Sequence, residues 1–205
     1  MRNKIIFCFF LIFISISILE LLLRFSGYKP WVSKSKNQET IFKFDTILGW
    51  ISKEGRYFIP SINDSKKIEF TIKKNGNRYA GKPDIRDFDE LILIGGSFTQ
   101  GAGVSDSETF AYQLQSKLVN YNVLNYGQSG YGSVQSLLLL NEVLKKKNKS
   151  KIIIYGFINH HLRRNVARGQ WLETLQKSTS EGFSQKPSIP YGIIDKNDNL
   201  KIMPK

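Results

Sequence analysis

Hydrophobic residues follow two different patterns along the chain: one long apolar run near the N-terminus, and short apolar runs that alternate with amphipathic segments after residue 88. From Ile5 to Leu23, only Glu20 is charged. A helix over this run would be roughly 28 Å long at ~1.5 Å per residue, which is close to the thickness of the hydrocarbon layer of a bilayer. Because the run has no polar face, it favours a membrane span over a helix buried in a protein core.

Residues 1–24 are predicted to form an uncleaved, single-pass membrane anchor. No A-x-A-like cleavage site follows the apolar run, and Cys8 comes too early for a lipoprotein cleavage site. The basic residues after the run outnumber those before it: Arg24, Lys29, Lys34 and Lys36 against Arg2 and Lys4. That count would place the following chain inside, but long domains translocate largely regardless of charge. We expect the protein in the cell membrane, with its main domain extracytoplasmic.

Residues 25–88 are predicted to be a linker followed by a lead-in of short strands. The polar run 33–40 is typical of a juxtamembrane linker. The segment Ile68–Lys73 alternates apolar with polar residues, as a half-exposed strand does, and Asn75-Gly76 supplies a turn after it. We expect these strands to pack beside the main domain.

Residues 89–205 are predicted to form an α/β domain. Three short runs, 91–94, 123–126 and 152–155, have the apolar character of buried strands. Helical spacing between them predicts one helix that starts near Asp106 or Ser107 and another that starts at Ser133. A further helix is expected near Trp171–Leu175. Strands that alternate with helices through short turns indicate a parallel sheet.

Composition narrows the class of protein. With 16 Gly, 6 Pro and one cysteine, the chain is neither collagen-like, nor low-complexity, nor a disulfide scaffold. The formal net charge of +13 indicates attraction to anionic lipid, polysaccharide or nucleic acid. Because the basic residues are spread along the chain without interleaved aromatics, we expect no nucleic-acid partner.

Three polar or glycine-rich loops follow the three strands, and they contain Ser97, Gly130 and Asn159. In parallel sheets, ligands bind beyond the carboxyl ends of the strands, so these loops are predicted to form an active site. The first loop matches neither phosphate-binding pattern, and Thr99 breaks the G-x-S-x-G pattern. A serine in such a turn can still be a nucleophile, with nearby backbone N–H groups for an oxyanion. The alternative is a small-residue turn that only allows tight packing.

Two blocks of sequence resemble the SGNH (GDSL-type) hydrolase superfamily. Residues 95–101, Gly-Gly-Ser-Phe-Thr-Gln-Gly, look like its first block, and residues 125–132, Asn-Tyr-Gly-Gln-Ser-Gly-Tyr-Gly, are similar to its second. The loop after residue 157 stands where the third block should be. The resemblance covers about residues 90–165. It implies a three-layer, flavodoxin-like parallel sheet, which this chain would leave incomplete at its C-terminus.

The resemblance also implies a chemistry. Ser97 would be the acyl nucleophile, and its own N–H, the N–H of Gly130 and the side chain of Asn159 would form the oxyanion hole. Family members hydrolyse or transfer ester-linked acyl groups, often acetyl on carbohydrate, without a metal or cofactor. The expected partners are therefore an acylated carbohydrate or another ester, and the membrane through the N-terminal helix. The oligomeric state is left open.

The chain departs from the family pattern in three places. Gly96 replaces the usual Asp of the first block, and Asn159-His160-His161 replaces Asn-Asp in the third, so either Asn159 or His160 could be the third oxyanion donor. The late Asp-x-x-His block that supplies the family's base is absent from these 205 residues. One of the two histidines could be the base, or they could merely make the loop polar. Two hypotheses therefore stand: a membrane-anchored serine esterase or O-acyltransferase, and an inactive module of the same fold that binds glycan or an envelope partner.

Overall fold

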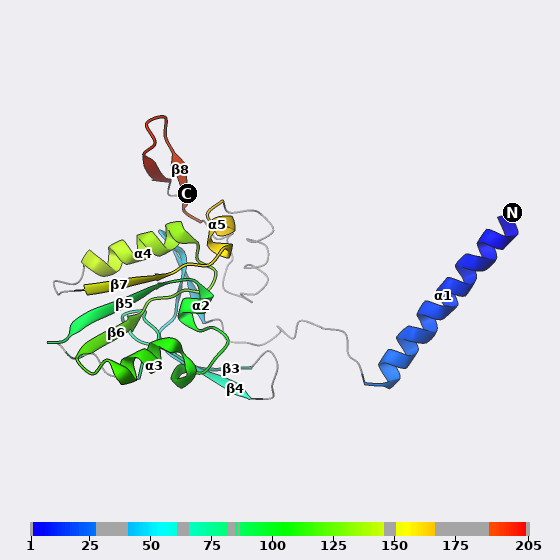
Figure 1. Cartoon of the computed structure of the whole chain (residues 1–205), viewed down its shortest axis with the longest axis horizontal. Coiled ribbons are helices and arrows are strands. Elements are labelled where there is room, and N and C mark those ends of the chain that lie inside the picture. Colours follow the sequence, from blue (N-terminus) through cyan, green and yellow to red (C-terminus); the bar gives the residue numbers. More distant parts are fainter. Residues whose placement is uncertain are drawn as a thin grey trace. The chain divides into compact units, whose positions relative to one another are not determined.

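The computed structural model describes residues 2–27, 41–60, 66–81, 85, 87–145, 151–166 and 189–203 (Figure 1). The chain divides into two compact units, residues 1–36 and 37–205. Each unit is described by itself.

The first unit contains the single helix α1 (Arg2–Phe25). Its residues 3–25 are long and apolar enough to cross a membrane, a property that a signal sequence shares. The hydroxyls of Ser15 and Ser17 donate to backbone carbonyls four residues earlier, and Arg24 pairs with Glu20 at 2.8 Å. The polar side chains of the helix thus bond within the helix itself, which suits an apolar environment.

The second unit is built on a parallel sheet of three strands, as predicted, but the expected burial of residues 152–155 is wrong, because their side chains are 40–47% exposed at the edge of the sheet. These are β5 (Asp89–Gly95), β6 (Tyr121–Asn125) and β7 (Lys151–Gly156), in the order β6-β5-β7. Both outer strands run parallel to β5, with Leu93 opposite Asn125 and Gly95 opposite Gly156. The first strand in the chain therefore lies in the centre of the sheet.

Helices α3 (Phe110–Lys117) and α4 (Ser133–Lys145) cover opposite faces of this sheet (Figure 1). Alternate residues of β5 point to the two faces, because side chains alternate along a strand. Leu91 and Leu93 join the core under α3, whereas Ile92 and Ile94 join the core under α4. The side chains of Leu91, Ile92, Leu93 and Ile94 are all buried, which explains the continuous apolar run of β5.

The helix expected to start near Asp106 or Ser107 instead begins with a separate turn. Residues Asp106–Glu108 form the 3₁₀ helix η1, whose N-terminus is capped by a capping box between Ser105 and Glu108. Thr109 then caps α3 by accepting a hydrogen bond from the backbone N–H of Tyr112. Each helix has its own cap, so the acidic positions of the first helix do not extend into the second. The helix predicted from Ser133 is confirmed.

The lead-in forms two antiparallel hairpins. The first joins β1 (Phe42–Asp45) to β2 (Gly49–Ser52), and the second joins β3 (Gly55–Pro60) to β4 (Lys67–Ile72). Strand β4 and the turn that follows it match the predicted strand and turn. The backbone N–H of Arg78 donates to the carbonyl of Asn125 at 2.8 Å, which links this region to β6.

The described residues of the second unit also include α2 (Ser97–Gln100), α5 (His160–Arg164), β8 (Tyr191–Ile194) and β9 (Leu200–Met203). The last two strands form an antiparallel hairpin. The helix expected near Trp171–Leu175 lies outside the described residues.

Candidate active site

The three loops singled out in the sequence start from the same edge of the sheet. Strands β5, β6 and β7 are parallel, and they end at Gly95, Asn125 and Gly156. Ser97 is the first residue of α2, Gly130 lies in the loop before α4, and Asn159 precedes α5. All three therefore follow the carboxyl ends of their strands, where ligands bind in sheets of this kind.

Ser97 is a half-buried residue in a turn that is partly buried. Gly96 before it and Thr99 and Gln100 after it are buried, whereas Phe98 is 74% exposed. Within the described residues, the Ser97 hydroxyl makes no hydrogen bond. This serine is thus reachable from solvent and not used to hold the turn together.

Thr99 fills a space between two strand ends. A β-carbon at Gly95 or Gly156 would collide with the Thr99 hydroxyl, and one at Gly95 would also lie 2.8 Å from the carbonyl oxygen of Gly156. Gly95 has a φ of +153°, a value that residues other than glycine rarely adopt. The residue that breaks the G-x-S-x-G pattern is therefore accommodated by glycines on β5 and β7.

The second loop packs on α2 backbone to backbone. A β-carbon at Gly127 would lie 2.7 Å from the carbonyl carbon of Thr99, so no side chain fits there. The side-chain amide of Asn125 donates to the Thr99 carbonyl at 2.8 Å, and the N–H of Gln128 donates to the Gly95 carbonyl at 2.9 Å. These contacts fix the loop that contains Gly130, a buried glycine with a φ of +89°.

A buried polar network connects α2 to the hairpin β1–β2. The side-chain oxygen Oε1 of Gln100 accepts from the N–H of Ser129 at 3.0 Å and from its hydroxyl at 2.5 Å. The Gln100 amide donates to the Ser52 hydroxyl at 3.0 Å, which in turn donates to Gln128 at 2.7 Å. Fully satisfied buried networks rigidify the groups they join. This network could not be predicted from the sequence, because the residues that form it are far apart along the chain.

The two adjacent histidines after the third loop, His160 and His161, are the first residues of α5 and differ in exposure. Asn159 and His160 are exposed, and within the described part of the chain no hydrogen bond joins either side chain to Ser97 or Gly130. His161 has 0% of its surface exposed. The opposite orientations expected of neighbouring residues are thus observed, and the buried member of the pair is His161.

The imidazole of His161 is bonded on one side only. Its Nδ1 lies 2.7 Å from the hydroxyl of Tyr155, which donates to the hydroxyl of Ser133 at 2.8 Å. Its Nε2 is buried and has no hydrogen-bond partner among the described residues. Burial, followed by the charges of Arg164 and His160, lowers the pKa of His161 below its ordinary value of 6.5. The ring is therefore neutral at pH 7.

Helix α5 occupies the space where a side chain at position 96 would lie. A β-carbon at Gly96 would be 2.6 Å from His161 Nε2 and 3.1 Å from Arg164 Nη1. The Arg164 guanidinium also donates to the carbonyl of Tyr131 at 3.0 Å, which holds α5 against the second loop. His161 Nε2 thus lies close to the position that a side chain at residue 96 would occupy.

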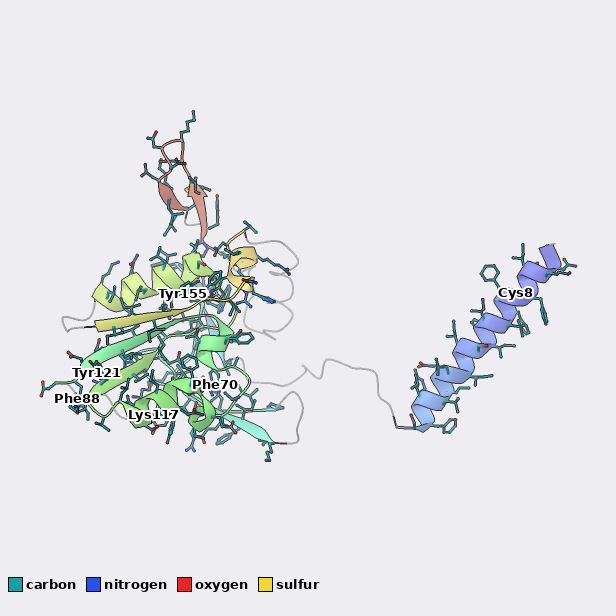
Figure 2. The ribbon with its side chains drawn as sticks, in the orientation of Figure 1. Cys8, Phe70, Phe88, Lys117, Tyr121 and Tyr155 are labelled. Atoms are coloured by element: carbon teal, nitrogen blue, oxygen red, sulfur yellow. The ribbon has the colours of Figure 1, made fainter. Side chains whose placement is uncertain are left out.

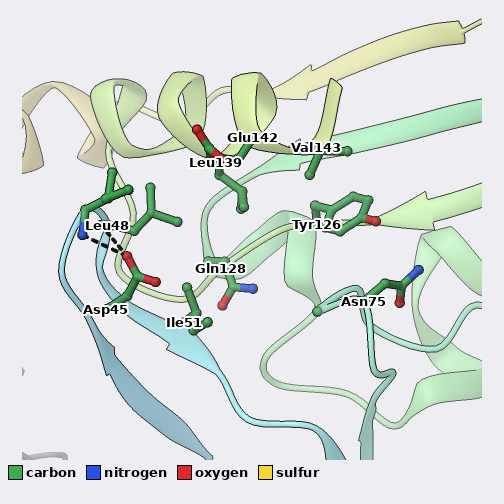
Figure 3. A pocket seen from close by; sticks show the side chains of 11 residues that line it. Asp45, Leu48, Ile51, Asn75, Tyr126, Gln128, Leu139, Glu142 and Val143 are labelled. Atoms are coloured by element: carbon green, nitrogen blue, oxygen red, sulfur yellow. Dashed lines mark hydrogen bonds between the residues drawn. The ribbon is translucent and has the colours of Figure 1, made fainter. Parts of the chain in front are cut away.

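A separate apolar pocket of about 350 Å³ lies between the hairpin β1–β2 and α4 (Figure 3). Leu48 and Ile51 line it from the hairpin, and Leu139 and Val143 line it from α4. Ser97, Gly130 and the third loop do not contribute to it. In the described part of the chain, no three His, Cys, Asp or Glu side chains come close enough together to hold a metal ion.

Comparisons with known proteins find similar folds only among solved structures. No known protein family and no curated protein matches the chain. The SGNH-hydrolase family esterase AlinE4 is 21% identical over 52% of this chain and 59% of its own, with a TM-score of 0.35. Two mutants of AlinE4 match at 20% identity and the same TM-score, over 46% and 52% of this chain. The chain spans between 53% and 59% of the length of these esterases. Similarity at this level assigns neither family nor activity.

Proposed function

We propose that the protein is a serine esterase or O-acyltransferase in which Ser97 attacks an acyl ester. The observation that carries this proposal is the accessibility of Ser97 in a rigid, buried turn at the edge of the sheet. A nucleophile must reach its substrate while its surroundings stay fixed, because misplacement by about 1 Å can cost 100-fold in rate. The Ser97 hydroxyl has no structural bond to give up, which leaves it available for such a reaction.

An acyl-transfer site also needs donors for the oxyanion that forms on the substrate carbonyl. The backbone N–H of Gly130 and the side chain of Asn159 or His160 are the proposed donors, together with the N–H of Ser97 itself. Gly130 follows β6 and Asn159 follows β7, on either side of the loop that contains Ser97. Their arrangement on neighbouring strand ends supports a common site.

The substrate class follows from the sequence blocks alone. Their resemblance to SGNH hydrolases favours an acyl ester of carbohydrate, with acetyl as the acyl group. The apolar helix α1 would hold such an enzyme at a membrane, close to envelope polysaccharide. Water as second nucleophile would make the enzyme an esterase, and a sugar hydroxyl would make it a transferase.

The test is turnover of p-nitrophenyl acetate by the full chain in detergent micelles. Ser97→Ala should lower kcat by roughly 1,000-fold or more, because removing a serine nucleophile abolishes the covalent route. A fluorophosphonate probe should label Ser97 in the unaltered protein, as peptide mass spectrometry would show. Release of acetate from an acetylated oligosaccharide would then identify the substrate class.

Ser107→Ala is the matched control, because Ser107 is an exposed serine on η1. This variant should retain the full rate and the labelling. A folded protein that shows neither turnover nor labelling of Ser97 would contradict the proposal and favour an inactive, glycan-binding module. Equal rates for Ser97→Ala and Ser107→Ala would exclude Ser97 as the nucleophile.

A further inference from the structure

We propose that His161 is the general base for Ser97, held in its working tautomer by Tyr155 and Ser133. This inference rests on the proposed esterase function and names a base for it among the described residues. His161 lies in α5, directly after the third loop, and it is buried, whereas its neighbour His160 is exposed.

Three geometric observations support this role. First, Nε2 of His161 is buried and lacks a hydrogen-bond partner among the described residues, although leaving a buried polar atom unpaired is unfavourable. Second, this nitrogen faces Gly96, the residue next to Ser97, where a β-carbon would lie only 2.6 Å away. Third, the absence of a side chain at position 96 is what leaves the nitrogen room to lie beside the nucleophile turn.

The other side of the ring sets which nitrogen holds the proton. Tyr155, on β7 beside α4, donates its hydroxyl proton to Ser133 (Figure 2). Its oxygen then accepts the Nδ1 proton of His161 across 2.7 Å. A neutral histidine has a proton on one nitrogen only, so Nε2 presents its lone pair toward the nucleophile turn. A general base requires this arrangement.

The proton balance of the reaction is complete with these groups. As the Ser97 oxygen forms a bond to the acyl carbon, its proton moves to His161 Nε2 and the carbonyl electron pair moves onto the oxyanion. When the ester C–O bond breaks, Nε2 returns that proton to the leaving alcohol. Water or a sugar hydroxyl then attacks acyl-Ser97 and gives its proton to Nε2, which finally returns the proton to the Ser97 oxygen.

The surroundings of His161 keep it in the basic form at neutral pH. Arg164 and His160 are its charged or titratable neighbours on α5, Tyr155 faces it from β7, and the nucleophile turn contributes no charge. Burial and the two basic neighbours favour the neutral imidazole. The acid limb of the rate profile should therefore lie below pH 6.5.

The experiment compares variants of the full chain in detergent micelles with p-nitrophenyl acetate. His161→Gln should lower kcat by about 100- to 10,000-fold with little change in KM, as loss of a general base does. Tyr155→Phe keeps the aromatic ring at position 155 but removes the hydroxyl that accepts from His161 Nδ1. It should lower kcat by a smaller factor than His161→Gln and shift the pH of the acid limb. Arg163→Gln, on the exposed side of the same short helix, is the control and should leave kcat unchanged.

Because His161 is buried, folding is checked by the thermal unfolding midpoint of each variant. If His161→Gln does not fold, the base is tested in His161→Gly, where added imidazole should restore turnover, and in the acid limb of the unaltered protein. Turnover that depends on Ser97 but persists in folded His161→Gln would overturn this inference and leave the esterase function intact. Absence of any Ser97-dependent turnover would instead contradict the function on which the inference rests. No rescue by imidazole, together with the absence of an acid limb below pH 6.5, would also overturn it.

Discussion

At the scale of single residues, the glycines of the candidate site are explained by what lies beside them. Gly127 contacts the backbone of α2, and Gly96 contacts the histidine and arginine of α5. A sequence reading treats both as turn residues, since glycine is common wherever the chain bends. The structure shows instead that each is small because another group occupies the space of its side chain.

His161 gives a prediction about stability at the same scale. Its pKa in the folded protein lies below the ordinary 6.5 because of burial and of Arg164 and His160. Between the folded and unfolded pKa values, the unfolded chain binds a proton that the folded chain does not, so stability rises with pH. The free energy of unfolding should therefore fall as pH drops below 6.5, and level off below the folded pKa.

Urea unfolding of the full chain between pH 5 and 8 checks this expectation. Carboxylates also become protonated as the pH falls. The quantity to compare is therefore the decrease in the free energy of unfolding of the unaltered protein minus the same decrease in His161→Gln. That difference should be positive below pH 6.5 and close to zero above it. An identical loss in both proteins would show that the burial of this imidazole does not oppose its protonation.

At the scale of elements, Arg78 joins the lead-in hairpins to the nucleophile turn. Its guanidinium is fully buried, pairs with Asp106 at 2.9 Å, and donates to the carbonyls of Gln100 at 2.8 Å and of Val104 at 2.7 Å. It also lies 4.1 Å from the ring centre of Phe70 on β4. Burial lowers its pKa, and the bond to Asp106 acts in the opposite direction. One side chain thus positions the residues that follow Ser97.

Arg78→Met should lower the free energy of unfolding by about 3–5 kcal/mol, because it leaves the Asp106 carboxylate buried without its partner. Arg78→Lys should also destabilise the protein, since an ammonium cannot reproduce the fork of donors. The control is Arg56→Met, which breaks an ion pair with Glu69 between side chains that are 63% and 39% exposed. That exposed pair should contribute at most about 1 kcal/mol. Equal losses in both arginine variants, measured by urea unfolding, would contradict the role given to Arg78.

At the scale of the whole molecule, the sequence predicted the strands and helices better than the long-range polar contacts that join them. The three strands of the parallel sheet were found from short apolar runs, which are buried in β5 and β6 but exposed in β7. The polar contacts between distant parts of the chain were not predicted. Ser52 and Gln128 are 76 residues apart, Gln100 and Ser52 are 48 apart, and Arg78 and Asp106 are 28 apart. No local pattern marks such pairs, since a polar residue in a loop looks the same whether it is solvated or buried.

The same sheet leaves an apolar strand at one edge. Within the described residues, β7 pairs only with β5, and its residues Ile152, Ile153 and Ile154 are 47%, 43% and 43% exposed. An exposed, unpaired and apolar edge strand is a template for pairing with another chain. We therefore expect the protein to self-associate through β7 as its concentration rises.

Ile152→Lys should reduce this self-association, because a charge on an edge strand opposes edge-to-edge pairing. Val119→Lys adds the same charge at a turn residue that is 64% exposed and outside the strands, so it should associate like the unaltered protein. Sedimentation velocity of the three full chains in detergent micelles, over a 100-fold range of concentration, measures the difference. Association that is equally weakened by both lysines would indicate a general effect of charge, and association unchanged by either would place the contact outside β7. Tyr155, on the same strand, bonds to the proposed base His161. If chains associate along β7, the Ser97-dependent rate should therefore vary with concentration in the unaltered protein but not in Ile152→Lys.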